Sequence, residues 1–256
     1  METKLIPLLS ISSVLFILIF SILNTAFKDG QFTCNRYILN TYLYVILAIT
    51  FIALLLSILR YKDIFLFQNI KAGYMPLMLL LFVGLLGTVI GIGVISPKNV
   101  LLKHLLWLLF VILIAVSFHP IHYLYGKAGL DKLINVAFLT TLSLVLVLTA
   151  FAFYKPELIS LSWGPVLFFM LLGVILLELI ILMVKGYNPT KLHRAITYLV
   201  IGIFMGYLLY DTKMLQVRAK SCTKGTADYI KESLNIFLDI WNLFIRILSL
   251  GGRRGR

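Results

Sequence analysis

Residues 206–215 read GYLLYDTKML, where an apolar run that begins near Leu199 ends on an aspartate, Asp211. The next apolar run contains a second aspartate, Asp239, in the stretch NIFLDIWNLF at residues 235–244. Ionisable side chains are rare in membrane segments, because removing a charge from water costs free energy, and those that occur commonly have a function. The two stretches therefore indicate neighbouring membrane helices that keep carboxyl groups where water is scarce.

The rest of the chain has the same membrane character. Of its 256 residues, 61% are hydrophobic and 13% are charged, whereas about half and about a quarter are usual in soluble domains. A helix of about 20 mostly apolar residues spans a bilayer. The runs that reach or approach this length are Leu5–Phe27, Ile38–Leu59, Tyr74–Ile95, Leu101–Phe118, Leu133–Tyr154, Gly164–Val184, Ala195–Tyr210 and Tyr229–Leu250.

We therefore expect an all-α membrane protein, a single polytopic domain with a bundle of seven or eight transmembrane helices. The connecting loops are too short for a separate soluble domain, and the continuous apolar runs argue against a membrane β-barrel. Within residues 1–256, an additional N-terminal helix and loop would occupy 1–37, the main bundle 38–250, and a basic tail, GGRRGR, 251–256.

Smaller signals concern packing and loops. Two G-x-x-x-G pairs, Gly87 with Gly91 and Gly202 with Gly206, predict close contact between helices. The residues after Tyr210 are interpreted as a basic loop of 18 residues before the last run. The stretches that carry prolines, glycines and charges, and are therefore interpreted as loops, are 95–99, 118–132, 154–158 and 185–191.

The formal net charge is +13. Its basic residues lie mostly in loops and the tail, where they meet lipid headgroups, so the expected partner is the lipid bilayer, with protein partners in the membrane left open and no nucleic acid. Their counts on the two sides are too similar to fix the orientation. Cys34 and Cys222 are single cysteines in separate loops, which gives little support to a metal site or a disulfide.

Polar residues in the last run recur at steps of three or four, which places them on one face of a helix. They are Asp228, Lys231, Asn235, Asp239, Asn242 and Arg246. Such a face is costly against lipid, so it contacts other helices, a water-filled cavity or the membrane surface. Two interpretations remain open: an amphipathic helix at the surface, and a spanning or re-entrant helix packed against the one that carries Asp211.

If these two segments pack antiparallel, the Asp211 and Asp239 carboxyl groups can face each other. Two carboxylates at low dielectric share a proton or hold a cation between them. Oxygen ligands suit Ca²⁺, so the pair is a candidate proton switch and a tentative Ca²⁺ site. No cofactor is expected. The sequence has no G-x-S-x-G, H-E-x-x-H or phosphate-binding loop, which leaves enzymatic activity without support.

Other polar residues are candidates for supporting roles, each with an open alternative. Glu178 is a functional carboxyl group or a hydrogen-bonded packing residue within its helix. Tyr207 donates a hydrogen bond to the nearer aspartate or anchors the helix at the interface. Arg246 is an internal counter-charge or extends its side chain to the surface. Asn235 and Asn242 line the polar face or bond to neighbouring helices.

Three stretches together resemble the transmembrane Bax inhibitor motif family, of the Bax inhibitor-1 type. They are FLTTLSLVLVLTAFAFYKPELISLSWGPVLFFMLLGVILLELI at 138–180, GYLLYDTKML at 206–215 and DYIKESLNIFLDIWNLFIRILSL at 228–250. The likeness is weak from residue 101 and good from residue 133 onward. The resemblance implies a seven-helix bundle with the last helix in a central position, and it assigns the family's di-aspartyl pH sensor to Asp211 and Asp239.

The resemblance also implies a passive Ca²⁺ leak or Ca²⁺/H⁺ exchange across an intracellular membrane, with effects on cell-death sensitivity. The sequence departs from the family pattern in two places. A basic partner for the aspartates has only loose matches in Lys98 and Arg60, and the extra segment Leu5–Phe27 resembles the mitochondrial growth-hormone-inducible branch. The membrane would then be the mitochondrial inner membrane or that of the endoplasmic reticulum or Golgi. The alternative is an accessory subunit of a larger complex that kept the fold and lost transport.

Overall fold

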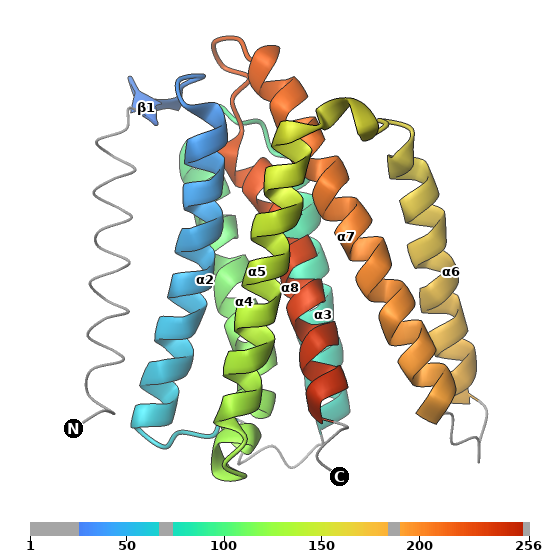
Figure 1. Cartoon of the computed structure of the whole chain (residues 1–256). Helices are drawn as coiled ribbons and strands as arrows, with labels where there is room; N and C mark the ends of the chain where they lie inside the picture. The colour runs from blue at the N-terminus through green and yellow to red at the C-terminus, as the bar shows by residue number, and fades with distance from the viewer. Residues whose placement is uncertain (1–25, 67–73, 184–189, 253–256) are drawn as a thin grey trace. The chain divides into compact units, whose positions relative to one another are not determined.

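The computed structural model describes residues 26–66, 74–183 and 190–252 (Figure 1). Its elements are β1 (Phe27–Lys28), β2 (Gln31–Phe32), α2 (Tyr37–Tyr61), α3 (Tyr74–Val94), α4 (Val100–Lys127), α5 (Asp131–Tyr154), the 3₁₀ helix η1 (Pro156–Leu158), α6 (Trp163–Met183), α7 (Thr190–Lys220) and α8 (Tyr229–Gly252). Seven helices in these ranges are long and apolar enough to cross a membrane. The prediction of an all-α membrane protein is therefore confirmed, whereas nearly all of the expected segment Leu5–Phe27 lies outside the described residues.

The chain divides into two compact units. Unit 1 comprises residues 1–130 and 219–234 and so contains α2, α3, α4 and the first turns of α8. Unit 2 comprises residues 131–218 and 235–256 and contains α5, α6, most of α7 and the remainder of α8. That the whole chain forms a single domain with a central last helix stays a prediction.

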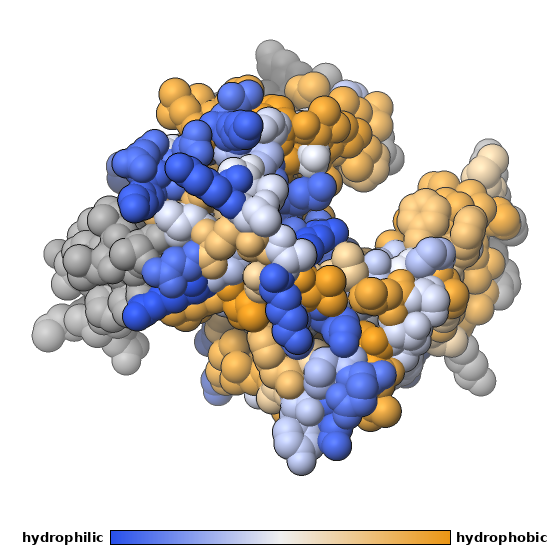
Figure 2. All heavy atoms as spheres, turned by 90° about the horizontal axis from the view of Figure 1, so that it is seen from above, coloured by the Kyte–Doolittle hydropathy of each residue, from blue (hydrophilic) through white to orange (hydrophobic). Residues whose placement is uncertain are grey.

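In unit 1, α4 packs against both α2 and α3. The contact is apolar, and its members are buried because leucine, isoleucine and aromatic side chains recur on the facing sides of the helices. Among these buried residues are Leu43, Ala48, Ile52, Ile92, Phe110, Val111 and Ile114. Other faces carry exposed apolar side chains, such as those of Leu79 and Leu80, as expected of a surface against lipid. Figure 2 views the helices from one end and shows hydrophilic atoms gathered over helix ends, with hydrophobic atoms on the flanks of the helices.

A two-stranded hairpin precedes α2 in unit 1. Phe27 of β1 pairs with Phe32 of β2, and the turn between the strands is Asp29–Gly30. Both turn residues have positive φ angles, 53° and 71°, which the Asp-Gly dipeptide adopts at low cost in tight hairpins. The hairpin was not predicted, because Phe27 was assigned to the end of an apolar run.

In unit 2, α6 and α7 approach closely at Gly206. A Cβ atom added at Gly206 would lie 2.8 Å from Leu167 Cδ2 of α6, whereas one at Gly202 would have no atom of the described residues within 4 Å. In unit 1, a Cβ at Gly91 would lie 3.1 Å from a leucine of α4, and one at Gly87 would meet no atom in the described part of the chain. Within that part, Gly91 and Gly206 are the members of the two predicted pairs that allow close packing.

Replacing Gly206 with leucine is expected to lower the free energy of unfolding by about 1–2 kcal/mol, because the added side chain overpacks the contact with Leu167. Gly202→Leu is the matched control: it makes the same change in helix propensity on the same helix at an open position. Thermal unfolding in mild detergent measures both. Equal Tm values for the two variants would contradict the packing role of Gly206.

Two predicted helix ends are wrong. The run that was expected to end at Tyr210 continues as α7 to Lys220, because KMLQVRAK consists of good helix formers although it is no longer apolar. The stretch 118–132 was expected to be a loop, yet α4 continues through Pro120 to Lys127. Proline is tolerated inside membrane helices, where neighbouring groups and local adjustment satisfy the freed carbonyl.

The prediction that Cys34 and Cys222 give little support to a disulfide is also wrong. The two residues are disulfide-bonded, with their Cα atoms 5.8 Å apart, although 188 positions separate them in the sequence. Cys34 precedes α2 and Cys222 lies between α7 and α8, both in unit 1. Single cysteines in separate loops revealed no pairing because the pairing depends on which loops meet at the same end of the helices.

Candidate functional site

The two aspartates lie in unit 2, on the helices that follow each other in sequence. Asp211 is half-buried on α7, and Asp239 on α8 is 5% exposed. Their carboxyl groups lie close enough for a side-chain hydrogen bond. A carboxylate only accepts hydrogen bonds, so this bond requires a proton on one of the two groups. The structure brings the predicted pair together, and its role as a switch stays a prediction.

The surroundings of the pair disfavour two full charges. Asp239 Oδ2 is buried, and it has no hydrogen-bond partner within the part of the chain that the structure describes. An ionised carboxylate with an unsatisfied oxygen is costly in such a place. Tyr207 lies one turn before Asp211 on α7, close enough to interact electrostatically with both aspartates. A proton on the pair therefore avoids a second negative charge beside the buried Asp239 side chain.

A second charged contact in unit 2 joins α6 to α8. Arg246 Nη1 donates to Glu178 Oε1 at 2.6 Å, and Nη2 donates to Oε2 at 3.1 Å. The side chains are 29% and 27% exposed. In this bidentate geometry, two hydrogen bonds join the guanidinium to the carboxylate, which makes it one of the strongest kinds of ion pair. Of the open alternatives, Arg246 is thus an internal counter-charge rather than a side chain that extends to the surface, and its partner is Glu178 rather than the aspartates.

The two asparagines on α8 differ in what they contact. Asn242 Nδ2 donates to the carbonyl oxygen of Leu238 at 2.8 Å, a bond within its own helix. Asn235 is half-buried one turn before Asp239, on the same helix face. Asn242 therefore stabilises its own helix, and Asn235 is the asparagine that lies next to Asp239 on the helix face.

A resident metal site is not evident in unit 2. Within residues 26–66, 74–183 and 190–252, no three His, Cys, Asp or Glu side chains gather in a group that could hold a metal ion. Ca²⁺ takes six to eight oxygen ligands, so two carboxyl groups supply only part of its coordination shell. Binding of Ca²⁺ by Asp211 and Asp239 stays a prediction, in which Ca²⁺ is a transported ion.

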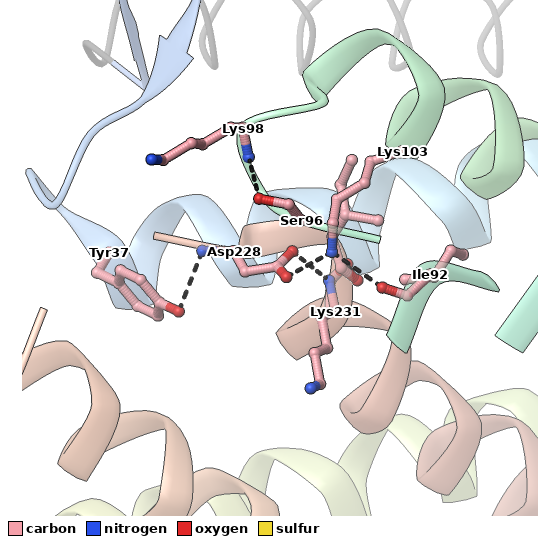
Figure 3. Close-up of polar contacts among 9 residues, drawn as sticks. Tyr37, Ile92, Ser96, Lys98, Lys103, Asp228 and Lys231 are labelled. Carbon is pink, nitrogen blue, oxygen red and sulfur yellow. Dashed lines mark hydrogen bonds and ion pairs between the residues drawn. The ribbon is translucent and has the colours of Figure 1, made fainter. Parts of the chain in front are cut away.

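The sequence interpretation missed a buried ion pair in unit 1. Lys103 of α4 is fully buried, and its Nζ lies 2.5 Å from Asp228 Oδ2 and 2.9 Å from the carbonyl oxygen of Ile92 (Figure 3). Asp228 was predicted to belong to the polar face of the last helix. It instead precedes α8 and caps it, because its Oδ1 accepts from the Lys231 backbone N–H at 3.1 Å. The available signal was a lysine inside the apolar run LLKHLLWLLF, which needs a partner.

These features define a multi-pass α-helical membrane protein with a hydrogen-bonded aspartate pair and two charged helix contacts. Residues 34–256 match the model of the family described as "Inhibitor of apoptosis-promoting Bax1". The chain therefore belongs to this Bax inhibitor family, which confirms the resemblance found in the sequence.

Relatives among known proteins agree with this assignment. The inner membrane protein YbhL of Escherichia coli strain K12 is 26% identical over 155 residues, which cover 59% of this chain and 63% of YbhL. YbhL of Escherichia coli O6:H1 gives the same values. The match thus spans less than two thirds of the length of these relatives.

Proposed function

We propose that the protein is a Ca²⁺-permeable leak channel or Ca²⁺/H⁺ exchanger whose conduction depends on protonation of Asp211 and Asp239. The observation that carries the proposal is the hydrogen bond between these carboxyl groups, which links α7 to α8 in unit 2. Family membership and the helical membrane fold favour a channel-like protein over an enzyme. The membrane would be that of an intracellular organelle, where a regulated leak affects ion balance and cell-death sensitivity.

The proton sets the strength of the link between the two helices. With one proton on the pair, a neutral carboxyl group donates to a carboxylate, and such a charge-assisted bond is about twice as strong as a neutral one. Removing that proton leaves two negative charges that repel each other. Adding a second proton leaves only a neutral bond. The helices are thus held most firmly at one proton, and flux is lowest at that pH and rises on both sides of it.

Ca²⁺ flux into liposomes, followed as the pH is varied, tests this mechanism. We expect wild-type flux to change by about tenfold across the titration. This corresponds to a change of about 1.4 kcal/mol in the free energy of the contact between α7 and α8. Asp211→Asn and Asp239→Asn should each remove the minimum in flux, because the remaining carboxyl group can hydrogen-bond to the asparagine amide whether or not it carries a proton. Asp63→Asn, the same change at an exposed carboxylate in unit 1, is the matched control and should behave as wild type.

Two results would count against the proposal. Flux with the same pH dependence in both asparagine variants would exclude the aspartate pair as the switch. Wild-type protein without any flux that co-purifies stoichiometrically with a larger assembly would instead support the accessory-subunit alternative.

A further inference from the structure

The disulfide of unit 1 joins the segment before α2 to the connector before α8. Cys34 lies between the hairpin and α2, and Cys222 lies in the connector between α7 and α8, residues 221–228. Both cysteines are partly exposed, and they are the only two in the chain. Any thiol that the protein presents therefore comes from this bond.

The disulfide lies beside the contacts that hold the start of α8. Cys34 Sγ is 3.2 Å from the carbonyl oxygen of Thr223 in the connector. The Tyr229 hydroxyl donates to the carbonyl oxygen of Thr33, and its ring packs edge-on against Tyr37, with the ring centroids 5.3 Å apart. The first turn of α8 is thus attached to the segment before α2 by a covalent bond and by aromatic and hydrogen-bonded contacts.

The ion pair described above is the second attachment. Asp228 ends the connector and is bound to the buried ammonium group of Lys103, and its backbone N–H faces the Tyr37 hydroxyl at 3.4 Å (Figure 3). The connector itself has little regular structure, and its internal hydrogen bonds join Thr223 and Thr226. The disulfide is thus the covalent link between the connector before Asp228 and the segment before α2.

A disulfide also indicates which side of the membrane this end faces. Disulfides persist in oxidising compartments and are rare where glutathione and thioredoxin keep thiols reduced. The Tyr37 end of α2 and the Tyr229 end of α8 therefore lie opposite the cytosol or, in a mitochondrion, opposite the matrix. The other end of α2 then faces the reducing side.

We propose that Cys34–Cys222 is a thiol–disulfide exchange site on the non-cytosolic face, and that its oxidation state fixes or releases the connector that precedes Asp228 and α8. The substrate class is a dithiol reductant. One of its thiolates attacks Cys34 or Cys222, forming a mixed disulfide and releasing the other cysteine as a thiolate, which takes up a proton. The second thiol of the reductant then resolves the mixed disulfide, so that two electrons and two protons pass to the protein.

Two features of the surroundings favour exchange. The sulfurs are not enclosed, since both cysteines are partly exposed. Lys220 and Lys224 are exposed and flank Cys222 two positions away on either side, and cationic side chains stabilise a departing thiolate. The proposal concerns unit 1 and does not depend on Ca²⁺ flux.

Thiol labelling in sealed vesicles tests the site and its sidedness. The full chain is treated with a membrane-impermeant phosphine reductant, and free thiols are then detected by the gel shift of a maleimide-polyethylene glycol. We expect no shift without reductant, a shift of two labels when the non-cytosolic face is outward, and none in inverted vesicles. Labelling without reductant, equal labelling in both orientations, or no labelling in either would overturn the proposal.

Tryptic cleavage of the detergent-solubilised chain tests the release of the connector. Reduction is expected to accelerate cleavage after Lys220 and Lys224 by about tenfold or more, because loss of the cross-link raises the population of the open connector. Cleavage after Lys62, at the opposite end of α2, is the internal control and should not change.

The variant that carries both Cys34→Ser and Cys222→Ser should be cleaved rapidly with or without reductant. Since wild-type protein is reduced chemically, the test does not rely on this variant folding. An unchanged rate of connector cleavage after complete reduction would show that the disulfide does not hold the connector.

Discussion

Replacing Lys103 with methionine is expected to lower the free energy of unfolding by about 3–5 kcal/mol, because the Asp228 carboxylate is then left in the interior without its cation. The Lys103 side chain is fully buried, and that of Asp228 is 12% exposed. Methionine keeps most of the volume of the lysine stem. The loss of stability therefore measures the effect of removing the charge rather than of creating a cavity. Thermal and denaturant unfolding in mild detergent measure it.

The reciprocal variant separates the charge of Asp228 from its capping role. Asparagine at position 228 still accepts a hydrogen bond from the Lys231 backbone and remains a good cap. Asp228→Asn should nevertheless be strongly destabilising, because it leaves the Lys103 ammonium group unpaired. Combining it with Lys103→Met removes both charges and is expected to recover most of the loss, which gives a coupling energy from the double-mutant cycle.

The exposed pair Lys127–Asp63 is the matched control for this cycle. Its side chains are 57% and 64% exposed, so Lys127→Met should cost far less stability than Lys103→Met. The Lys127 hydrogen bond holds the pKa of Asp63 below its usual value. The small contribution of this pair is therefore present above the unfolded pKa, about 4, and is lost as the pH falls. A Lys103→Met effect no larger than that of Lys127→Met would contradict the importance of the buried pair.

The predictions that held rest on local patterns. Each of the seven described helices was visible as an apolar run, because the bilayer requires a minimum length of apolar sequence whatever the tertiary contacts. The errors at Pro120 and beyond Tyr210 arose where a helix continues without the apolar pattern. Such ends depend on helix propensity and on neighbouring groups rather than on hydropathy.

The site was predictable in part for the same reason. Asp211 and Asp239 lie on consecutive helices, where antiparallel packing is the simplest arrangement, so their meeting could be expected. Contacts between residues far apart in the sequence could not be predicted. Arg246 is 68 positions from its partner and Lys103 is 125 positions from its own. A charge inside an apolar run indicates that a partner exists, but the helix arrangement decides which residue it is.

Glu178→Gln is expected to destabilise the protein by about 2–3 kcal/mol, and by more than Arg246→Gln does. The guanidinium of Arg246 cannot lose its proton, so in Glu178→Gln a full charge remains on a membrane helix without its carboxylate. In Arg246→Gln, the lone carboxyl group can instead take up a proton and become neutral. The loss in that variant should therefore shrink as the pH is lowered, whereas the loss in Glu178→Gln should not.

Unfolding of the two variants across the pH range checks this asymmetry. The exchanged variant, Glu178→Arg with Arg246→Glu, is the control for packing: it restores the pair with reversed polarity and should recover part of the stability lost by either single change. Equal losses in the two single variants, both independent of pH, would show that the contact between α6 and α8 depends on side-chain volume. The pair would then not be the ionic link between these helices that its two hydrogen bonds of 2.6 and 3.1 Å indicate.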